Sequence, residues 1–399
     1  MSKQIPQGYK QTKLGIIPED WEVVKLHKVA AITGGKRIPK GEFLTTEHTG
    51  FPYIRVTDMY MGGVNFESLL FVPKHVAPLI KNYRITSNDL FITVAGTLGI
   101  IGKIPNKLNN ANLTENANKI TVNYGSKNFI FFILSSNLIQ TKIKSVSTNN
   151  AQPKLALEQI RNFIIPIPPI KEQEKIAEIL TTWDDAIAKQ EQLIEQKQVF
   201  KKGLMQQIFS QKRRFKDDNG NDYPVWQEQR LGEIADISTG QSNREDSSLI
   251  GKYTFFDRSQ EIRTSDIYLF DGEAIIVAGE GQDFIPKYFI GKFDLHQRTY
   301  AIMNLKNLIT KYLFYYIYMN RGYFFTQAVG STVKSLRLPL FQKMPVMLPI
   351  IPEQNKIADF ITLIDDGITK LSEELEQLKL QKKCLMQKLL TGQVRVRIL

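Results

Sequence analysis

Two segments of the chain place apolar residues at alternating spacings of four and three, which is the pattern of a helix with one apolar stripe. The stripe is nearly complete in the segment that begins near residue 351, whereas the segment that begins near residue 171 has a more polar middle. The pattern predicts two long helices that pair as a coiled coil within the chain, because two copies in one chain make intramolecular pairing easier; a dimerising coiled coil between two chains is the alternative. The expected seam residues are Ile176, Leu180, Trp183, Ile187, Ile194 and Leu204 in the first helix, and Ile357, Ile361, Ile364, Ile368, Leu371, Leu375 and Leu385 in the second.

Both predicted helices have clear boundaries. The proline-containing segments 165–169 and 348–352 cannot continue a helix backwards. Acidic residues follow at Glu172, Glu174 and Glu353, where they favour the positive end of the helix dipole. Thr391 and Gly392 provide an expected end for the second helix.

The two predicted helices are copies of one sequence. From Glu172 and Glu353 onward they align at a constant offset of 181 residues, and 18 of 44 positions are identical. The repeat extends upstream more faintly, because VAG occurs at 94–96 and again at 277–279, and Trp21 and Trp226 open similar segments. The chain therefore consists of two halves that share a framework and differ in the segments between its elements.

The distribution of charge suggests an acidic partner. The net charge is +12, and residues 1–170 contain 20 Lys and Arg against 10 Asp and Glu. Residues 216–350 contain 15 basic and 16 acidic residues. Nucleic-acid binding would therefore depend electrostatically on the first segment, although many basic proteins bind no polyanion.

Residues typical of an active site are scarce in the sequence. The four histidines are scattered without metal spacing, and the single cysteine, Cys384, excludes an internal disulfide. The segment 95–103 lacks the spacing of a phosphate loop, so we interpret it as a strand, a glycine turn and a strand. Asp184 and Asp185 lie about 100° apart on a helix, and we interpret them as charges that face solvent or a partner. We expect neither catalytic residues nor a bound metal.

The sequence also carries no membrane or export signal that we recognise. No apolar run approaches the roughly 18 residues that cross a bilayer, and the first residues lack the apolar region of a signal peptide. We therefore expect a cytoplasmic protein that does not bind membranes.

Three features together resemble the specificity (S) subunit of type I restriction-modification systems. They are the tryptophan followed by a strand pattern, the helix start IPIPP with Glu172 and Gln173, and the repetition of this unit. The second copy departs from the motif by having Pro349, two isoleucines and Pro352 in place of the double proline, but Pro352 still stands at the helix entrance. The resemblance covers essentially the whole chain.

This resemblance implies an α+β fold with a pseudo-twofold internal repeat, in which an antiparallel two-helix coiled coil separates two α/β target recognition domains. The expected domains are a first recognition domain at 1–170, a central spacer helix at 171–215, a second recognition domain at 216–350 and a distal spacer helix at 351–399. It also implies that each recognition domain reads one part of a bipartite double-stranded DNA target, while the spacer fixes the gap between the parts.

The resemblance further implies that the chain holds no cofactor itself. Two methyltransferase (M) subunits would dock on it and carry S-adenosylmethionine, and restriction (R) subunits would join with ATP and magnesium. An adaptor that joins two proteins through its coiled coil without reading DNA is the alternative.

Polar loop residues are the candidates for DNA contact, because Arg suits guanine, Asn and Gln suit adenine, and Asp can accept from cytosine. In the first domain they follow the opening strand, where glycines permit close approach to a backbone, and recur in two later segments. These candidates are Lys36, Arg37, Lys40, Arg55, Thr57, Asp58, Asn149, Asn150, Gln152 and Lys154. In the second domain the candidates are Gln241, Ser242, Asn243, Arg244, Asp257, Arg258, Ser259, Gln260, Ser331, Thr332, Lys334 and Arg337.

Overall fold

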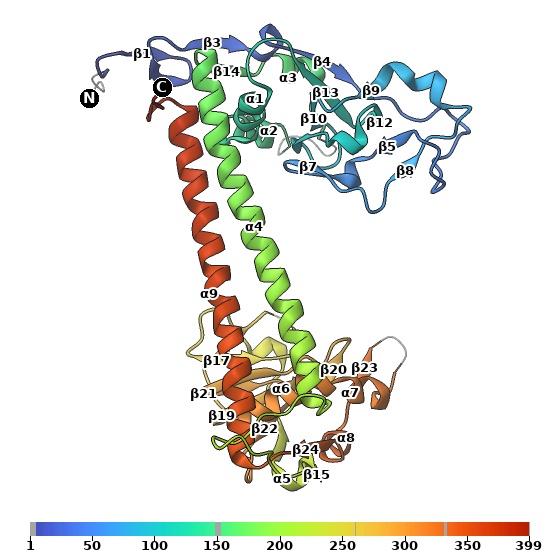
Figure 1. Ribbon diagram of the computed structural model, residues 1–399, viewed down its shortest axis with the longest axis vertical. Coiled ribbons are helices and arrows are strands. Elements are labelled where there is room, and N and C mark those ends of the chain that lie inside the picture. The colour runs from blue at the N-terminus through green and yellow to red at the C-terminus, as the bar shows by residue number, and fades with distance from the viewer. Residues whose placement is uncertain (1–4, 148–152, 260, 331–332, 399) are drawn as a thin grey trace. The chain divides into compact units, whose positions relative to one another are not determined.

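A computed structural model describes residues 5–147, 153–259, 261–330 and 333–398. The chain forms two compact units, the first made of residues 1–190 and 374–399 and the second of residues 191–373. The two long helices, α4 (Ile170–Phe209) and α9 (Ile351–Leu390), each contribute a segment to both units. The fold predicted from the sequence is confirmed in class, since each unit joins a mixed α/β domain to an antiparallel helix pair (Figure 1).

The helices end earlier than the predicted spacer segments do. α4 stops at Phe209 and α9 at Leu390, whereas the predicted segments ran to residues 215 and 399. Gly392 adopts a left-handed backbone (φ 70°) and its N–H bonds to the carbonyl of Leu389 at 3.3 Å, so the expected glycine end is present.

Within its described residues, the first unit contains two four-stranded sheets, three two-stranded sheets and a helical layer. One sheet has the order β11-β10-β13-β4 with antiparallel neighbours, and the other has the order β8-β5-β12-β9. The strands are β1 (Tyr9–Thr12), β2 (Gly15–Pro18), β3 (Glu22–Lys25), β4 (Ala30–Gly34), β5 (Pro52–Ile54), β6 (Met59–Tyr60), β7 (Gly63–Val64), β8 (Leu70–Phe71), β9 (Arg84–Ile85), β10 (Asp89–Thr93), β11 (Ile101–Lys103), β12 (Ala111–Leu113), β13 (Ala117–Val122) and β14 (Ile164–Ile167). The helices are α1 (Lys127–Ser135), α2 (Asn137–Ser147) and α3 (Leu157–Arg161), with 3-10 turns at Leu26–Lys28, Val56–Asp58, Ala77–Tyr83 and Asn106–Leu108.

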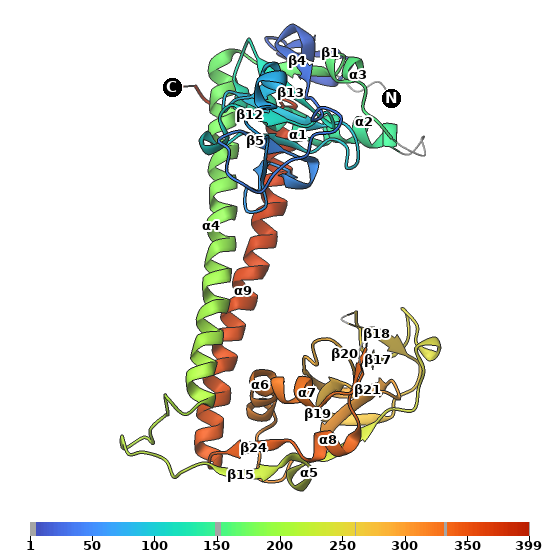
Figure 2. The same cartoon turned by 90° about the vertical axis from the view of Figure 1, so that its right-hand side faces the viewer.

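The second unit merges the equivalent strands into one six-stranded sheet of order β16-β22-β19-β21-β17-β18. Figure 2 shows this sheet with α6 and α7 beside it. The strands are β15 (Gln227–Arg230), β16 (Asp236–Thr239), β17 (Tyr253–Phe256), β18 (Arg263–Ser265), β19 (Phe270–Ala278), β20 (Glu280–Gly281), β21 (Lys287–Leu295), β22 (Thr299–Met303), β23 (Lys334–Ser335) and β24 (Pro345–Leu348). The helices are α5 (Leu231–Ile234), α6 (Thr310–Asn320), α7 (Gly322–Gln327) and α8 (Leu338–Gln342), with a 3-10 turn at Arg244–Asp246.

The two units use the same strand order around their cores. β4-β13-β10 corresponds to β16-β22-β19, and the central registers match in kind, because Ile32 pairs with Ile120 and Ile237 pairs with Ile302. The apolar segments within residues 127–135 and 310–320 form α1 and α6, which are largely buried against these sheets. The framework that repeats in the sequence therefore repeats in the structure.

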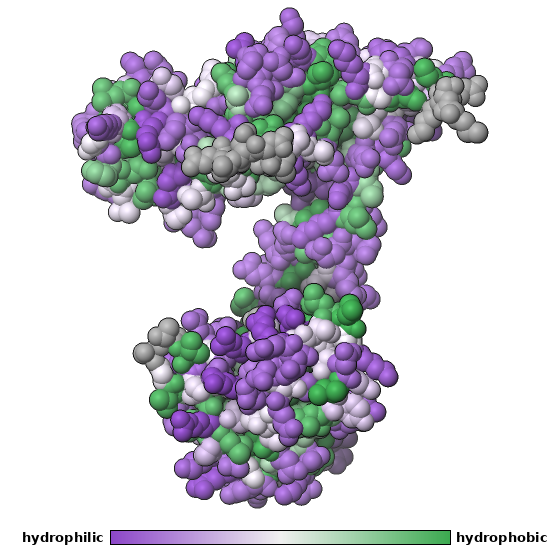
Figure 3. Space-filling model, turned by 180° about the vertical axis from the view of Figure 1, so that it is seen from behind, coloured by the Kyte–Doolittle hydropathy of each residue, from purple (hydrophilic) through white to green (hydrophobic). Residues whose placement is uncertain are grey.

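Every predicted seam residue is buried or half-buried. In the first unit Ile176 and Leu180 pack in one cluster with Leu389 from the other long helix. In the second unit Leu204 packs with Ile357 and Ile361. The exposed positions of the helices carry mostly polar residues, and the part of the helix pair visible in Figure 3 is largely hydrophilic, as expected for helices with a single apolar stripe.

Two ion pairs cross the helix seam at equivalent positions. The ammonium group of Lys382 donates to Asp184 in the first unit, and that of Lys201 donates to Asp365 in the second. Both lysines stand at seam positions, 181 residues apart. Asp184 and Asp365 therefore face the opposite long helix of the same chain.

A buried carboxylate fixes the start of each long helix. Glu172 has 0% of its surface exposed, and its Oε2 accepts a hydrogen bond from the indole N–H of Trp21 (3.0 Å). The guanidinium of Arg395, which follows the other long helix, donates to both of its oxygens (2.7 and 2.9 Å). These hydrogen bonds raise the pKa of Arg395. Glu172 thus joins both long helices to the opening strand segment.

The second unit contains the same arrangement. Glu353, also 0% exposed, accepts from the indole of Trp226 (3.0 Å) and from Arg214 (3.2 and 2.7 Å). Arg214 follows α4, so each arginine again comes from beyond the end of the opposite helix. We call each set of three residues an anchor: Trp21, Glu172 and Arg395 form the first, and Trp226, Glu353 and Arg214 the second.

The glutamine beside each anchor ties the helix start to the domain. Gln173 accepts from the backbone N–H of Ser126 (3.0 Å) and donates to a carbonyl of the preceding proline segment (2.8 Å). Gln354 likewise accepts from Ile309 (2.8 Å) and donates to the equivalent carbonyl (2.8 Å). The repeated Glu-Gln pair is therefore a structural connection between helix and domain, in addition to any effect on the helix dipole.

Replacement of Glu172 by alanine should destabilise the first unit. The change leaves the buried indole N–H of Trp21 without its acceptor and removes one of the two carboxylates that bind Arg395, the other being Asp20. We therefore expect the free energy of unfolding to fall by about 3 kcal/mol. Urea denaturation followed by circular dichroism measures this difference.

The matched control is Glu174→Ala, which removes an exposed acid from the same helical turn. It should change the free energy of unfolding by no more than about 0.5 kcal/mol. Equal effects of the two replacements would contradict the role of the anchor.

Candidate nucleic-acid interface

Loops gather in each unit at the carboxyl-terminal ends of two parallel strands. β5 and β12 run parallel in the first unit, as β17 and β21 do in the second. Loops at such strand ends vary on a fixed frame and commonly carry binding residues. We call these places the three-loop junctions; they comprise residues 35–40, 55–58 and 114–116 in the first unit, and residues 240–244, 257–259 and 296–298 in the second.

The two junctions are built alike. The backbone N–H of Thr114 donates to the carbonyl of Ile54 (3.1 Å), and that of His296 donates to the carbonyl of Phe256 (2.9 Å). Each bond joins the loop after one parallel strand to the end of the other. Most of the candidates for DNA contact lie in segments that are far apart in the sequence, and these segments meet at one place in each unit.

One glycine at each junction is required by the protein's own packing. A Cβ on Gly35 would lie 2.0 Å from the carbonyl oxygen of Thr114, and one on Gly240 would lie 1.6 Å from that of Leu295. These glycines therefore approach the backbone of a neighbouring segment of the same chain, where two loops cross tightly. The sequence had suggested that they approach the backbone of DNA.

The first junction presents three exposed basic side chains, those of Lys36, Arg37 and Lys40. Arg37 is held at its Nε by Oε1 of Glu115 (3.2 Å). Glu115 accepts a second hydrogen bond from the hydroxyl of Thr114 (3.0 Å). The carboxylate therefore orients one arginine while the two lysines extend from the same loop.

Asp58 does not have the role that the sequence suggested. It is 2% exposed, and Arg55 donates to it from its backbone N–H (2.8 Å), its Nε (3.0 Å) and its Nη2 (2.6 Å). A carboxylate occupied in this way closes a turn and cannot accept from a cytosine amino group. Arg55 is correspondingly engaged, and Thr57 remains exposed at the turn.

Several candidates lie away from the junctions or outside the described residues. Lys154 is exposed ahead of α3, and Arg337 is exposed ahead of α8. Lys334 lies in β23, which pairs with β20, and its ammonium donates to the carbonyl of Phe325 (2.9 Å). The candidates outside the described residues are Asn149, Asn150, Gln152, Gln260, Ser331 and Thr332.

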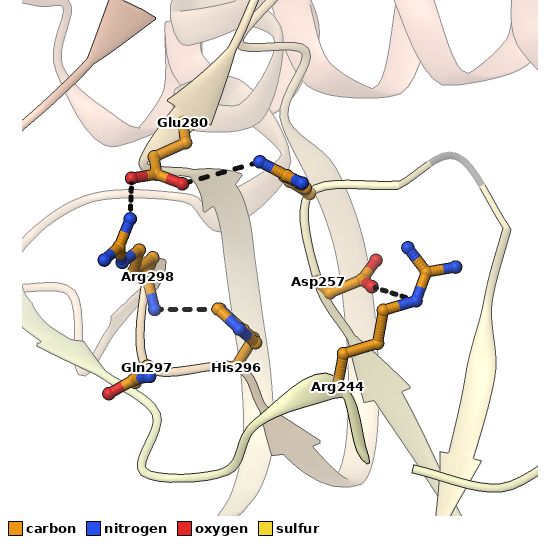
Figure 4. Close-up of a pocket in the computed structure, with 7 residues that line it drawn as sticks. Arg244, Asp257, Glu280, His296, Gln297 and Arg298 are labelled. Carbon is orange, nitrogen blue, oxygen red and sulfur yellow. Dashed lines mark hydrogen bonds and ion pairs between the residues drawn. The ribbon is translucent and has the colours of Figure 1, made fainter. Parts of the chain in front are cut away.

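The second junction opens into a polar pocket of about 240 Å³ (Figure 4). Two of its lining residues, Arg244 and Arg258, are exposed candidates from the sequence, and a third, Asp257, is buried. The remaining lining residues are Glu280, His296, Gln297 and Arg298. The pocket therefore concentrates guanidinium and amide donors, which can contact base edges or phosphates.

The loop after β16 divides into buried and exposed side chains. Ser242 is buried and its hydroxyl donates to Asp294 (2.7 Å), so it belongs to the core of the unit rather than to a binding surface. Asn243 accepts from the amide of Gln297 (2.6 Å), which joins two of the three loops. Gln241 is exposed beside them.

Asp257 holds the loop of residues 257–259 in place beside the pocket. Its Oδ1 accepts from the backbone N–H of Ser259 (2.7 Å) and from its hydroxyl (2.5 Å), and its Oδ2 lies 3.9 Å from Nε of Arg244. Burial alone would raise the pKa of this carboxyl, but these hydrogen bonds and the nearby cations hold it below its usual value. Asp257 and Ser259 are thus structural parts of the loop, which leaves Arg258 exposed between them.

His296 is held in its neutral form. Burial lowers its pKa, and the charges of Arg298 and Arg258 add to this effect, against the opposing charges of Asp257 and Glu280. Its Nδ1 accepts the backbone N–H of Arg298 (3.1 Å), which a protonated ring could not do. The histidine therefore helps to fix the loop that carries Arg298.

Glu115, Glu280, His296, Gln297 and Arg298 were not predicted from the sequence. Only Glu280 had a usable signal, because it directly follows the repeated VAG segment. The other four stand in short turns between strands, where nothing in the sequence distinguishes them from ordinary polar residues.

No metal or membrane site emerges from the described ranges. They contain no group of three or more His, Cys, Asp or Glu side chains placed to hold a metal ion. Among those same residues, no helix is long and apolar enough to span a bilayer.

Comparison with known proteins gives a consistent result. The family model "Type I restriction modification DNA specificity domain" matches residues 18–199 and 223–380. The chain is 25% identical to the putative type I restriction enzyme MjaX specificity subunit of Methanocaldococcus jannaschii, over 98% of this chain and 97% of that protein. It is also 25% identical to the MjaVIII specificity subunit of the same organism, over 96% and 94% of the two chains.

Solved structures agree in fold. The S subunit of a type I restriction-modification system from M. genitalium aligns with a TM-score of 0.57 at 16% identity, over 93% of this chain and 96% of that chain. A chain from a study of complex assembly and conformational transition of the type I R-M system aligns with a TM-score of 0.60 at 17% identity, over 95% and 99%.

The neutral histidine predicts a pH dependence in the second unit. Because its pKa is lower in the folded chain than in the unfolded chain, the unfolded state binds the proton first as pH falls below about 6.5. Its contribution to stability is therefore lost on acidification. Urea unfolding at about pH 7.5 and about pH 5.5 should show a smaller loss for His296→Gln than for the parent chain.

The replacement His48→Gln, at an exposed histidine of the first unit, controls for titration elsewhere. It should follow the parent chain. If His296→Gln lost as much stability on acidification as the parent, the neutral form of His296 would be refuted.

Proposed function

Because this chain belongs to the type I restriction modification DNA specificity family, we propose that its two units each read one part of a bipartite double-stranded DNA sequence. The observation that carries the proposal is the repeated three-loop junction, which places exposed polar donors on the same frame in both units. In this role the chain selects the sequence, and the chemistry on DNA is performed by other subunits.

Exposed residues at the junctions are the proposed DNA contacts. They are Lys36, Arg37, Lys40 and Thr57 in the first unit, and Gln241, Arg244, Arg258, Gln297 and Arg298 in the second. Asp58, Ser242 and Asp257 are better explained as groups that hold the loops. The candidates outside the described residues remain predictions.

The units are proposed to bind DNA with different balances of forces. The first junction carries several cations, which favours phosphate contacts and a marked dependence on salt. The second junction sets its three arginines beside Asp257 and Glu280, within a segment, residues 216–350, that contains 15 basic and 16 acidic residues. These near-neutral surroundings favour contacts to neutral base edges.

The partners follow from family membership and from the repeat. Two methyltransferase subunits are proposed to bind the two equivalent helix-start regions, because a repeated surface suits two copies of one partner. They would supply S-adenosylmethionine, and restriction subunits would supply the ATP- and magnesium-dependent steps. An adaptor that reads no DNA gives no reason for the second junction's concentration of arginines.

Methylation-sensitive sequencing of DNA from cells that express the chain with its partners tests the function. We expect modified adenine on both strands within one bipartite motif, with two specified parts separated by unspecified bases. A continuous motif, or none, would refute the proposal and favour the adaptor.

Insertion of one heptad into both long helices tests the role of the spacer. Gln190 donates to Glu374 (3.5 Å), so matched insertions after residues 190 and 373 keep the helices in register. Seven residues add about 10 Å of helix, which corresponds to about three base pairs. We expect the gap in the motif to lengthen by up to this amount.

Insertion into α4 alone is the control, because it shifts one seam against the other and should impair folding or assembly. An unchanged gap after the double insertion would show that the helices do not set the spacing.

A further inference from the structure

One carboxylate in the pocket at the second junction, that of Glu280, holds two arginines. Nη1 of Arg298 donates to Oε1 of Glu280, and Nη1 of Arg258 lies 3.6 Å from Oε2 of the same group. The side chain of Glu280 is 15% exposed, whereas those of Arg258 and Arg298 are 59% and 63% exposed. Figure 4 shows the carboxylate of Glu280 reached by guanidinium groups from two different loops.

We propose that Glu280 is a positioning residue that orients Arg298 and Arg258 to read guanine in the DNA half-site of the second unit. The inference rests on the proposed function. It adds that guanine is the base that is read, that Arg298 and Arg258 read it, and that Glu280 orders these two side chains.

The chemistry of the guanidinium supports this assignment. Arginine has five N–H donors in a planar fork, and two of them match O6 and N7 of guanine in the major groove. A carboxylate that binds one edge of the fork leaves another edge free and fixes its direction. A long flexible side chain is thereby ordered before DNA arrives, which lowers the cost of binding.

Glu280 itself is held by the fold. It pairs with Ser335 across the ladder of β20 and β23. The preceding Gly279 donates its N–H to the carbonyl of Arg298 (2.8 Å), so the carboxylate and one arginine stand on hydrogen-bonded backbones. The His296 ring, which accepts the N–H of Arg298, fixes the same loop from its other side.

The charges of the pocket favour a base edge over a phosphate. Three arginines face Asp257 and Glu280, which leaves an excess of one positive charge. Carboxylates beside a phosphate would repel it, whereas the guanine edge is neutral and presents only acceptors to the guanidinium.

The first unit uses a related device at its own junction. Arg37 is held by Glu115, which is fixed in turn by the hydroxyl of Thr114. A carboxylate-held arginine therefore occurs in both junctions, although the residues come from different loops.

The test uses the full chain assembled with its methyltransferase partners, on the motif found by methylation-sensitive sequencing. Duplexes carry 7-deazaguanine, which lacks the N7 acceptor, at one guanine of the second half-site at a time. For the parent chain we expect at least one such duplex to bind roughly 2- to 12-fold more weakly, because loss of N7 removes one of the two hydrogen bonds of the bidentate contact and leaves the one to O6.

Three variants separate the possible roles. Arg298→Ala should lose discrimination at that guanine, and Glu280→Gln should lose part of it while retaining its melting temperature and its dependence on salt. Asp283→Asn is the matched control, because it removes a negative charge from the same loop region; it should discriminate as the parent does. Methylated motifs from cells should relax at the same single position.

A different pattern would overturn the inference. Uniform weakening on all sequences by Arg298→Ala, with the salt slope reduced by about one, would identify a phosphate contact. Unchanged discrimination in Glu280→Gln, or a second half-site without guanine, would also refute it. The absence of any bipartite motif in cells with the parent chain is the distinct result that refutes the proposed function itself.

Discussion

A buried carboxylate at the start of each long helix is the interaction on which both units depend. A charge without solvent is tolerated only when its acceptors are satisfied, and Glu172 and Glu353 each receive an indole N–H and a bidentate guanidinium. The arginine always comes from beyond the end of the opposite helix. Antiparallel pairing of the helices is thus required by the anchors as well as by the apolar seam, and the domain is joined to the pair at the same point.

The long helices could be predicted because their signals are local. Spacing of apolar residues, prolines before the helix start and glycine after the end are all read within a few turns. The anchors were missed because Trp21 and Arg395 lie 151 and 223 residues from Glu172. One signal was available, however: Arg214 and Arg395 occupy the same place in the 181-residue repeat.

The loops were harder to interpret for a different reason. Asp58, Ser242 and Arg258 are all polar residues in variable segments, yet the first two are buried and only the third is exposed. Holding a loop and contacting a ligand require the same side-chain chemistry, and only the fold separates them. The two junctions share their backbone arrangement but differ in the side chains that join their loops. Arg37 pairs with Glu115 in the first junction, and Asn243 bonds to Gln297 in the second.

The anchor of the first unit has a consequence for synthesis on the ribosome. Domains generally fold in the order in which they are made. Glu172 cannot bind Arg395 until Arg395 has been synthesised. Residues 374–399 belong to the first unit, whereas the second unit ends at residue 373. The half of the protein that is translated first is therefore the half that finishes folding last, after Arg395 has emerged.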